Sequence, residues 1–347
     1  MNRASSRRRS SLGVSLVELM ISMVLGLIVA GAAVAMFATN RVTYSASENM
    51  GRIQEAGRTA FELMARDVRE AGGNPCDANL TLTNGLNAPT GSWWKNWNNG
   101  LIGYNGATAF PDVAFGTTAG ARVAGTEAIE VKYGELPRTV NVTAALTDAN
   151  LNQPIAVSTV TGLTVNDLLV ACDYRGATVF QATGFAGNTI LHASGAGTGG
   201  SPGNAGAALL LGPHGNDKDG NPMPGLAVNG MVSKLKASRW YVGCNGRVAC
   251  DQPGGRSLYQ SSLVNTAGTF SVVNDEIANG VSNMTMLYLP AGGTAYTNAA
   301  GVTNWSTVGA IKVTLTISAP DRSGSTDSNN AITRTTQHVI SLRNNLL

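Results

Sequence analysis

A long apolar segment near the N-terminus limits what this chain can fold into. The 24 residues from Val14 to Phe37 carry a single charged side chain, Glu18. A helix of that length extends about 36 Å, and the hydrocarbon core of a bilayer is about 30 Å thick. The preceding residues contain four arginines and no acid: Arg3, Arg7, Arg8 and Arg9. Basic residues before a span favour a cytoplasmic N-terminal end, so we expect a single membrane span with the remainder on the far side.

Two familiar kinds of segment explain this pattern incompletely. A secretory signal peptide has an apolar region of about 7–15 residues before a small-residue cleavage site. The stretch 32–38 (AAVAMFA) offers such a site, but the apolar run is longer and begins with an acid. A plain membrane anchor leaves Glu18 unexplained, because a carboxylate at the centre of a spanning helix costs roughly 2.5–3.5 kcal/mol.

The residues around Gly13 favour a third interpretation. The pattern Gly-x-x-x-x-Glu from Gly13 to Glu18 lies behind a short basic leader and ahead of an apolar stretch. It resembles the type IV prepilin signal that prepilin peptidase cleaves. The resemblance implies a leader of residues 1–13, cleavage after Gly13, and N-methylation of Val14 as the first mature residue, where the family usually has Phe.

In this interpretation the carboxylate of Glu18 has a partner. Cleavage creates an α-amine on Val14, and an isolated charge in apolar surroundings is very costly. By resemblance to pilins, Glu18 pairs with the α-amine of a neighbouring subunit as it moves from the bilayer into a filament. Such a pair would set the register of entry, while buried ion pairs often add little net stability.

The helical pattern continues beyond the apolar segment. No proline occurs between Asn40 and Ala71, and small or apolar side chains recur at the steps of three and four that define one helix face. These are Met50, Ile53, Gly57, Ala60, Met64 and Val68. The opposite face carries alternating charges: Arg58, Glu62, Arg66 and Glu70. Because Gly72, Gly73 and Pro75 end the pattern, we expect one helix over 14–71, with 14–39 in the membrane or filament core and 40–72 docked on a head domain.

Residues 73–347 have a different composition, rich in Gly, Asn, Thr and Ser and poor in charge. Strand-like runs recur between turn signals, at 127–134, 167–174, 177–184, 207–212, 238–243, 256–260, 281–290, 310–320 and 331–344. No long amphipathic helix follows Ala71. The chain is therefore predicted to be α+β and type IV pilin-like, with a mostly antiparallel β head that is large enough for two sheets.

Four cysteines lie in the head: Cys76, Cys172, Cys244 and Cys250. An even number in an exported domain predicts two disulfides, for which three connectivities exist. The short segment between Cys244 and Cys250 favours a local bridge, which leaves Cys76 to join Cys172. A metal site would need CxxC-type spacing or a neighbouring histidine, and the chain has neither.

No motif predicts an enzyme or a cofactor. The GxGxxG match at 195–200 has no helix after it, so it predicts a hairpin loop and no dinucleotide site. In the GxSxG match at 199–203, Pro202 directly follows Ser201, which argues against a nucleophile elbow. The histidines are scattered (His192, His214 and His338). The turn 217–221 begins like a calcium loop but lacks its glycine at position 6 and glutamate at position 12, so a polar turn is favoured over a calcium site.

Two further features concern partners. Trp93, Trp94 and Trp97 form either a loop packed over the sheet or an exposed contact surface for a pilin, an adhesin or a ligand. The net charge is +3 from 24 basic and 21 acidic residues. Without the four leader arginines it is 20 against 21, or −1, and the one basic cluster (233–239) also fits strand alternation. No nucleic-acid partner is expected.

Taken as a whole, the chain resembles PilW-type minor pilins of type IV pili, which are related to the J-type pseudopilins of type II secretion. The similar segments are 13–31, 66–76, 167–174 with 179–184, and 340–344. The resemblance implies a low-abundance subunit in the inner membrane with a periplasmic head, which moves to the tip of the extracellular pilus. Its partners would be prepilin peptidase, other minor pilins, the major pilin and a tip adhesin. A tip-exposed binding pilin and a secretion pseudopilin remain as alternatives.

Overall fold

The computed structural model describes residues 13, 15–76, 80, 82–88, 92–97, 100–146, 152–206, 225–320 and 331–344. Several predictions from the sequence lie outside these residues. They concern Val14 and most of the leader, the strand candidate at 207–212, His214, and the calcium-like turn at 217–221.

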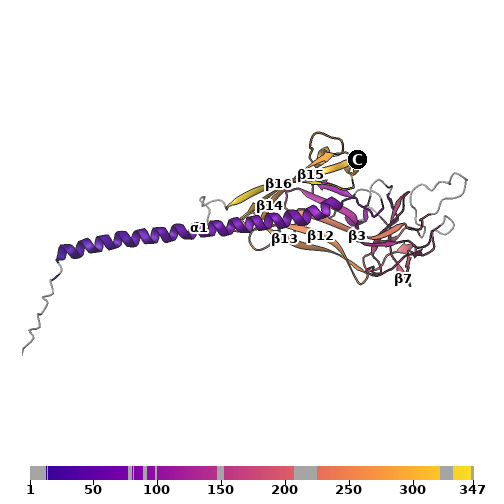
Figure 1. Cartoon of the computed structure of the whole chain (residues 1–347), viewed down its shortest axis with the longest axis horizontal. Coiled ribbons are helices and arrows are strands. Elements are labelled where there is room, and N and C mark those ends of the chain that lie inside the picture. Colours follow the sequence, from indigo (N-terminus) through magenta and orange to yellow (C-terminus); the bar gives the residue numbers. More distant parts are fainter. Residues whose placement is uncertain are drawn as a thin grey trace, which may run out of the picture.

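One long helix and a strand-rich head make up the molecule (Figure 1). Helix α1 (Leu16–Glu70) has 55 residues, which corresponds to a length of about 82 Å. The chain turns at Gly72, whose φ of 72° is a left-handed conformation that glycine adopts at little cost. The Gly72 N–H donates to the Lys132 carbonyl at 2.9 Å, which ties the helix exit to the head.

The head consists of sixteen strands in the described residues. They are β1 (Leu82–Asn84), β2 (Leu101–Tyr104), β3 (Ala128–Asn141), β4 (Ile155–Ala156), β5 (Leu168–Cys172), β6 (Ala177–Gln181), β7 (Gly184–Ala186), β8 (Thr189–Leu191), β9 (Gly195–Ala196), β10 (Gly203–Asn204), β11 (Met231–Cys244), β12 (Arg256–Thr266), β13 (Thr269–Asn279), β14 (Val281–Pro290), β15 (Val308–Ser318) and β16 (Thr333–Ser341). The described helical segments after α1 are 3-10 turns of three residues each. The predicted fold class, a long helix with a mostly antiparallel β head, is confirmed.

Two sheets form the main body of the head. The larger sheet has the order β1-β6-β5-β11-β12-β13, with β3 paired to β11 and β2 to β3. The second sheet is β14-β15-β16. The pairing of β1 with β6 is parallel, whereas the other pairs in these two sheets are antiparallel.

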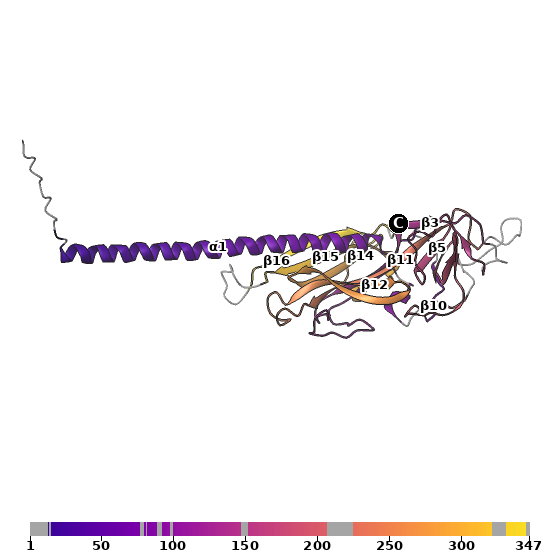
Figure 2. The ribbon, with the colours of Figure 1, turned by 90° about the horizontal axis from the view of Figure 1, so that it is seen from below.

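The second half of α1 runs along the head and closes the core between the two sheets (Figure 2). Its buried side chains Ile53, Ala60, Met64 and Val68 belong to one cluster with residues of both sheets, which include Trp240 of β11. The helix is therefore part of the core of the head, and removing it would expose the inner faces of both sheets to water.

Strand β13 was not predicted from the sequence. Most of its residues from Thr269 to Glu276 are exposed, and the strand lies at one end of the larger sheet. An edge strand with little buried surface has no alternation of apolar and polar residues to reveal it. The predicted strand at 281–290 coincides with β14, whereas β3, β11 and β12 extend further than predicted.

Candidate functional site

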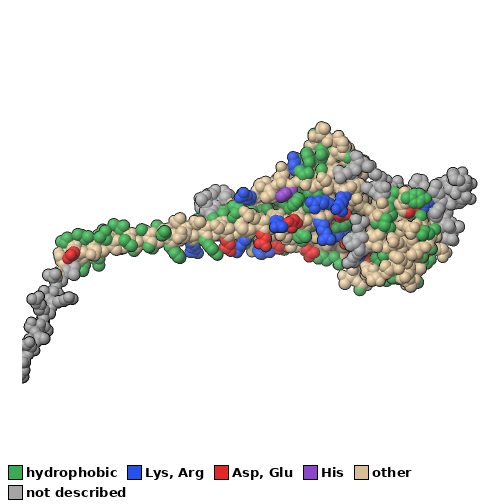
Figure 3. All heavy atoms as spheres, in the orientation of Figure 1, with side chains coloured by type: hydrophobic (Ala, Val, Ile, Leu, Met, Phe, Trp, Pro, Cys, Tyr) green, Lys and Arg blue, Asp and Glu red, His purple; other side chains and the backbone are tan. Residues whose placement is uncertain are grey.

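The N-terminal half of α1 has no covering protein. All 29 residues from Leu16 to Tyr44 are exposed, and the first buried residue of the helix is Asn49. Hydrophobic side chains lie along this free half (Figure 3), and the helix is long and apolar enough to cross a membrane. Soluble monomers rarely expose such a large apolar surface, so this half requires lipid or other helices around it.

Glu18 lies in the first turn of α1, on the exposed surface. Its Oε2 accepts a hydrogen bond from the Ser15 N–H at 3.3 Å, and Ser15 is the N-cap residue. The spacing Ser-x-x-Glu is that of a capping box, and a negative charge is also favoured near a helix N-terminus. Glu18 therefore has a local role in starting the helix, which the Ser-x-x-Glu spacing itself could have indicated. The predicted pairing with a neighbour's amine stays a prediction.

The docked half of α1 presents the predicted stripe to the head. Ile53, Gly57, Ala60, Met64 and Val68 are buried, and Met50 at the start of the stripe is half-buried. On the opposite face Arg58 and Glu62 form an exposed ion pair at 2.8 Å. The charged side chains visible along this half in Figure 3 belong to the solvated side of the helix.

Gly57 lets the helix approach strand β15 closely. A Cβ atom built on Gly57 would lie 2.8 Å from the Cδ1 atom of Ile317. Gly51, in the same helix, has no atom within 4 Å of such a Cβ. Gly57 therefore packs closely against the sheet, whereas the Cα of Gly51 faces open space.

Replacing Gly57 with leucine is expected to lower the free energy of unfolding by about 1–3 kcal/mol, because the larger side chain overpacks the contact with Ile317. The matched variant Gly51→Leu should be neutral or slightly stabilising, since leucine is the better helix former. Urea unfolding of the full-length protein in detergent measures both. Equal effects of the two substitutions would contradict close packing at Gly57.

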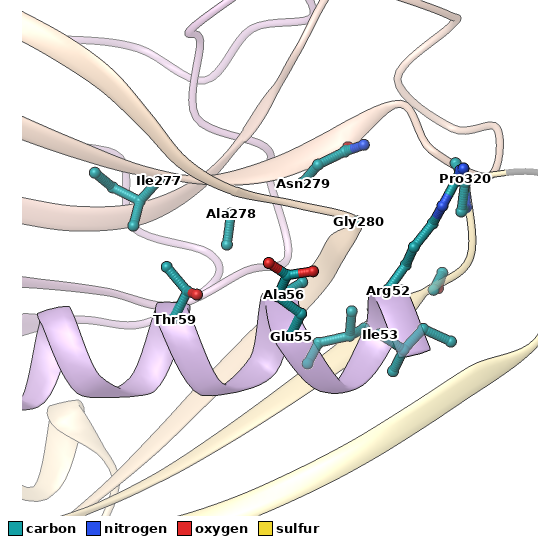
Figure 4. A pocket seen from close by; sticks show the side chains of 12 residues that line it. Arg52, Ile53, Glu55, Ala56, Thr59, Ile277, Ala278, Asn279, Gly280 and Pro320 are labelled. Atoms are coloured by element: carbon teal, nitrogen blue, oxygen red, sulfur yellow. The ribbon is translucent and has the colours of Figure 1, made fainter. Parts of the chain in front are cut away.

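A pocket of about 390 Å³ lies where the helix first meets the head. Figure 4 shows Arg52 and Thr59 on the helix side, with Ile277 and Ala278 opposite them at the end of β13. The pocket borders the close contact of Gly57, because Ile317 also lines it. A polar attachment of the helix to the head lies nearer the C-terminal end of the helix.

Asp67 provides that attachment. Its side chain is 2 % exposed, yet it is a carboxylate on the face that packs against the sheet. Five donors on β3, β11 and β12 surround it: Tyr133 Oη at 2.7 Å, Lys236 Nζ at 3.2 Å, Ser238 Oγ at 3.0 Å, Trp240 Nε1 at 3.1 Å and Gln260 Nε2 at 2.6 Å. Because these groups have fixed positions on three strands, one rotation and one register of the helix satisfy them all.

Tyr133 keeps its proton in this site. Burial raises the pKa of the Tyr133 hydroxyl, and the charge of Asp67 and its hydrogen bond raise it further. The hydroxyl therefore donates to the carboxylate at any physiological pH. The stripe predicted from the sequence did not include Asp67, although it lies three residues after Met64 and seven after Ala60, on the same face of the helix.

A second buried charge cluster joins β3 to β11. Glu130 pairs with Lys132, and its Oε2 accepts from Arg239 Nε at 2.9 Å. The Arg239 guanidinium lies 4.3 Å from the ring centroids of both Trp93 and Phe110. Burial lowers the pKa of the Lys132 ammonium, and the neighbouring Glu130 carboxylate opposes that shift.

The basic cluster 233–239 lies on β11, and each cation has a carboxylate partner. Lys234 Nζ lies 2.9 Å from Asp167, Lys236 Nζ 3.2 Å from Asp67, and Arg239 contacts Glu130. Strand alternation places these side chains on the two faces of the sheet, where each one pairs with a buried carboxylate of the protein.

The structure contains both disulfides, with the connectivity that the sequence favoured. Cys76 bonds to Cys172 with Cα atoms 6.0 Å apart, and Cys244 bonds to Cys250 with Cα atoms 5.1 Å apart. The first closes a sequence separation of 96 residues and joins the helix exit to β5. The second closes only the short connection between β11 and β12.

The prediction of an exposed contact surface at the three tryptophans is wrong. Trp93, Trp94 and Trp97 are 8 %, 7 % and 4 % exposed. Trp94 stacks on Phe270 with ring centroids 5.5 Å apart. These rings cover the apolar face of β5 and β6, which would otherwise face water, so the alternative of a loop packed over the sheet is correct.

The remaining motifs have structural roles. Ser201 lies between β9 and β10, where its hydroxyl donates to the Thr198 carbonyl at 2.6 Å and accepts from Gln181 Nε2 at 2.9 Å. The ring of His338 stacks on Phe61 of the helix with centroids 3.9 Å apart. The glycine-rich segment is thus a hairpin, as predicted, and its serine supports the turn.

Comparison with known proteins identifies the N-terminal segment. The prokaryotic N-terminal methylation motif matches residues 8–34, which span the leader junction and most of the free helix. No curated protein and no solved structure matches the chain. The motif implies processing by prepilin peptidase and assembly with other pilins, and the apolar helix fits an inner-membrane anchor that carries a head domain. The motif and the architecture together support a type IV pilin-like or pseudopilin-like protein.

Proposed function

We propose that this protein is a minor pilin of a type IV pilus, with a structural and non-enzymatic role. Prepilin peptidase removes residues 1–13, and Val14 becomes the methylated N-terminus. The subunit resides in the inner membrane, with its head in the periplasm, before it is incorporated into the pilus at the tip. The observation that carries the proposal is the helix half from Leu16 to Tyr44, which is uncovered and continuous with the docked half, and which is apolar up to Phe37 apart from Glu18.

Continuity of the helix gives this arrangement a mechanical consequence. Asp67 lies 49 positions after Glu18 in one unbroken helix, a distance of about 74 Å. A pair between Glu18 and a neighbour's amine would therefore fix the height of the head above that neighbour. A subunit placed in this way can present its head at the tip to other minor pilins and a tip adhesin, and prime the addition of major pilins below it.

The tip position rests on the resemblance to PilW-type minor pilins and on the size of the head. A head with two sheets and two disulfides offers more surface than helix packing requires. We infer that this surface contacts the neighbouring minor pilins and supports an adhesin.

Replacing Glu18 with alanine is expected to leave cleavage, insertion and folding intact while incorporation into pili falls by about tenfold or more, equivalent to about 1.4 kcal/mol. The physical reason is that the incoming amine loses its counter-charge in apolar surroundings. Immunoblots of sheared pili against membrane fractions measure the ratio, and mass spectrometry of the N-terminus should find Val14.

The matched control is Glu48→Ala, which removes an exposed acid from the same helix, where it pairs with Arg52 at 2.6 Å. Its incorporation should be normal. Normal incorporation of the Glu18 variant would contradict the pairing, and a mature N-terminus near Met36 would contradict prepilin processing.

Deletion of the gene separates the proposed role from its alternatives. Loss of surface pili supports a priming subunit. Normal pili with lost adhesion would instead indicate a binding pilin at the tip, and normal pili with blocked protein secretion would indicate a pseudopilin.

A further inference from the structure

Strand β13 leaves one edge of the larger sheet open. It is the last strand in the order of that sheet and pairs with β12 on one side. All six residues from Ser271 to Glu276 are exposed. This stretch is bounded at both ends, because the Phe270 N–H donates to the Gly199 carbonyl at 2.8 Å, and Ile277 lies opposite the helix in the pocket of Figure 4. The open edge, defined as residues 271–276, is therefore about 20 Å long.

The hairpin turn shows which backbone groups of the open edge point outward. The two-residue loop 267–268 between β12 and β13 has positive φ at both positions, 50° and 92°. The pair that flanks such a loop, here Thr266 with Thr269, is hydrogen-bonded, and bonded and non-bonded pairs then alternate along an antiparallel ladder. The peptide groups of Val272 and Asn274 therefore point away from β12. Within the described part of the chain, neither has a backbone hydrogen bond on that outer side.

The open edge lacks the features that usually keep the edges of sheets apart from other chains. Natural edge strands carry prolines, lysines or inward-pointing charges, or another element covers them. Residues 269–274 contain no proline and no charge, and Val272 and Val273 are 45 % and 37 % exposed on opposite faces of the strand. Unpaired peptide groups beside β-branched side chains are the features that an added strand uses.

The charge of the edge indicates the chemistry of the added strand. Asp275 is exposed, and no cation among the described residues forms an ion pair with it. Its neighbour Glu276 already pairs with Arg247 at 3.0 Å. Opposite charges on facing strands stabilise their pairing, and like charges weaken it. A second copy of β13 would add acids to the same ladder and no free cation, so a segment with a lysine or an arginine fits the edge better.

We propose that the open edge of β13 binds an extended segment of another protein, which adds a strand beside Val272 and Asn274 and places a lysine or an arginine next to Asp275. The peptide groups provide the hydrogen bonds, and the carboxylate selects a basic segment. The inference is independent of the pilin assignment, because it concerns only this edge of the head. Its failure would leave the proposed function unchanged.

Two capped hexapeptides that differ in one residue test the proposal, Ac-TVKVTV-NH2 and Ac-TVEVTV-NH2. The full-length protein in detergent carries ¹⁵N-labelled valine, so NMR follows hydrogen exchange at single valines, and equilibrium dialysis measures the affinities. The outward Val272 N–H should exchange quickly, whereas the Val273 N–H points to β12 and should exchange slowly. We expect the lysine peptide to slow exchange at Val272 by about tenfold or more, without change at Val273. It should bind about fivefold more tightly than the glutamate peptide.

Two variants separate the charge from the backbone. Asp275→Asn should bind both peptides with equal affinity, because the selecting charge is gone. Val272→Pro removes the outward donor and should weaken the binding of both peptides. Proline is tolerated at an edge position whose N–H faces solvent.

Three results on the wild-type protein would overturn the proposal, and none of them requires a variant to fold. Unchanged exchange at Val272 up to the solubility limit of the lysine peptide would overturn the binding edge. Equal affinity of the two peptides would overturn selection by Asp275. Protection of Val272 that needs no peptide and rises with protein concentration would identify a second copy as the occupant, in place of a basic segment.

Discussion

Replacing Asp67 with alanine is expected to lower the free energy of unfolding by about 3–5 kcal/mol, the loss seen when one partner of a buried, hydrogen-bonded charge network is removed. The substitution leaves the buried Ser238 and Trp240 donors without an acceptor, and it leaves Lys236 without its carboxylate. Each unpaired buried group adds a desolvation penalty. The docked half of the helix should then detach from the head more readily than it does in variants substituted on the exposed face of the helix.

Urea unfolding of the full-length protein in detergent, followed by tryptophan fluorescence, measures this loss. Glu62→Ala is the matched control, because it removes a carboxylate from the same helix where it faces solvent and pairs with Arg58. Exposed pairs contribute about 0.2–1 kcal/mol, so the control should change little. Asp67→Asn keeps the shape and one acceptor and should lie between the two.

A loss at Asp67→Ala no greater than that of the control would show that the five donors find other partners. It would also contradict the view that Asp67 sets the register of the helix. A proteolysis assay adds a local readout: in the alanine variant, cleavage within the docked half should become faster before the head itself unfolds.

The second large effect is expected for the disulfide between Cys76 and Cys172. Replacing both residues with serine should lower the free energy of unfolding by about 4 kcal/mol. Releasing a loop of about 100 residues gives the unfolded chain conformational entropy worth roughly 4.7 kcal/mol. The two cysteines lie 96 positions apart in the sequence, and their bond holds the helix exit against β5. Its loss should therefore destabilise both the head and the attachment of the helix.

The pair Cys244→Ser and Cys250→Ser provides the internal comparison. This disulfide spans a sequence separation of six, so its entropic contribution should be smaller, below the roughly 3 kcal/mol given for a 15-residue loop. Thermal unfolding of the two double variants, side by side with the oxidised protein, ranks the two bonds. A larger loss for the short loop would contradict the entropic account and point to local packing at the β11–β12 connection.

Much of the architecture could be predicted because its causes are local. A run of 24 residues with one charge predicts a long exposed helix whatever the rest of the chain does, and steps of three and four predict its docked face. The glycines at 72 and 73 end that helix within a few residues of the expected place. Strands such as β14 coincide with their predicted bounds because apolar runs flanked by turn residues need no distant partner to be recognised.

Other features could not be predicted because they depend on residues far apart in the sequence. The donors to Asp67 come from positions 66 to 193 residues away, so no local pattern distinguishes this acid from the exposed ones on the same helix. The tryptophans illustrate the same limit. Their exposure depends on which side chains pack over the face of β5 and β6. No local sequence pattern specifies that packing.

Local residue patterns were enough to establish the long apolar helix, the prepilin motif at Gly13 with Glu18 after it, and the helical and strand periods of the rest of the chain. Packing in three dimensions was needed to show which helix residue attaches to the head and whether the tryptophans face solvent. The physical reason is that hydrophobic periodicity and chain stiffness act over a few residues. The pairing of buried charges and the filling of space depend on contacts between residues that are far apart in the chain.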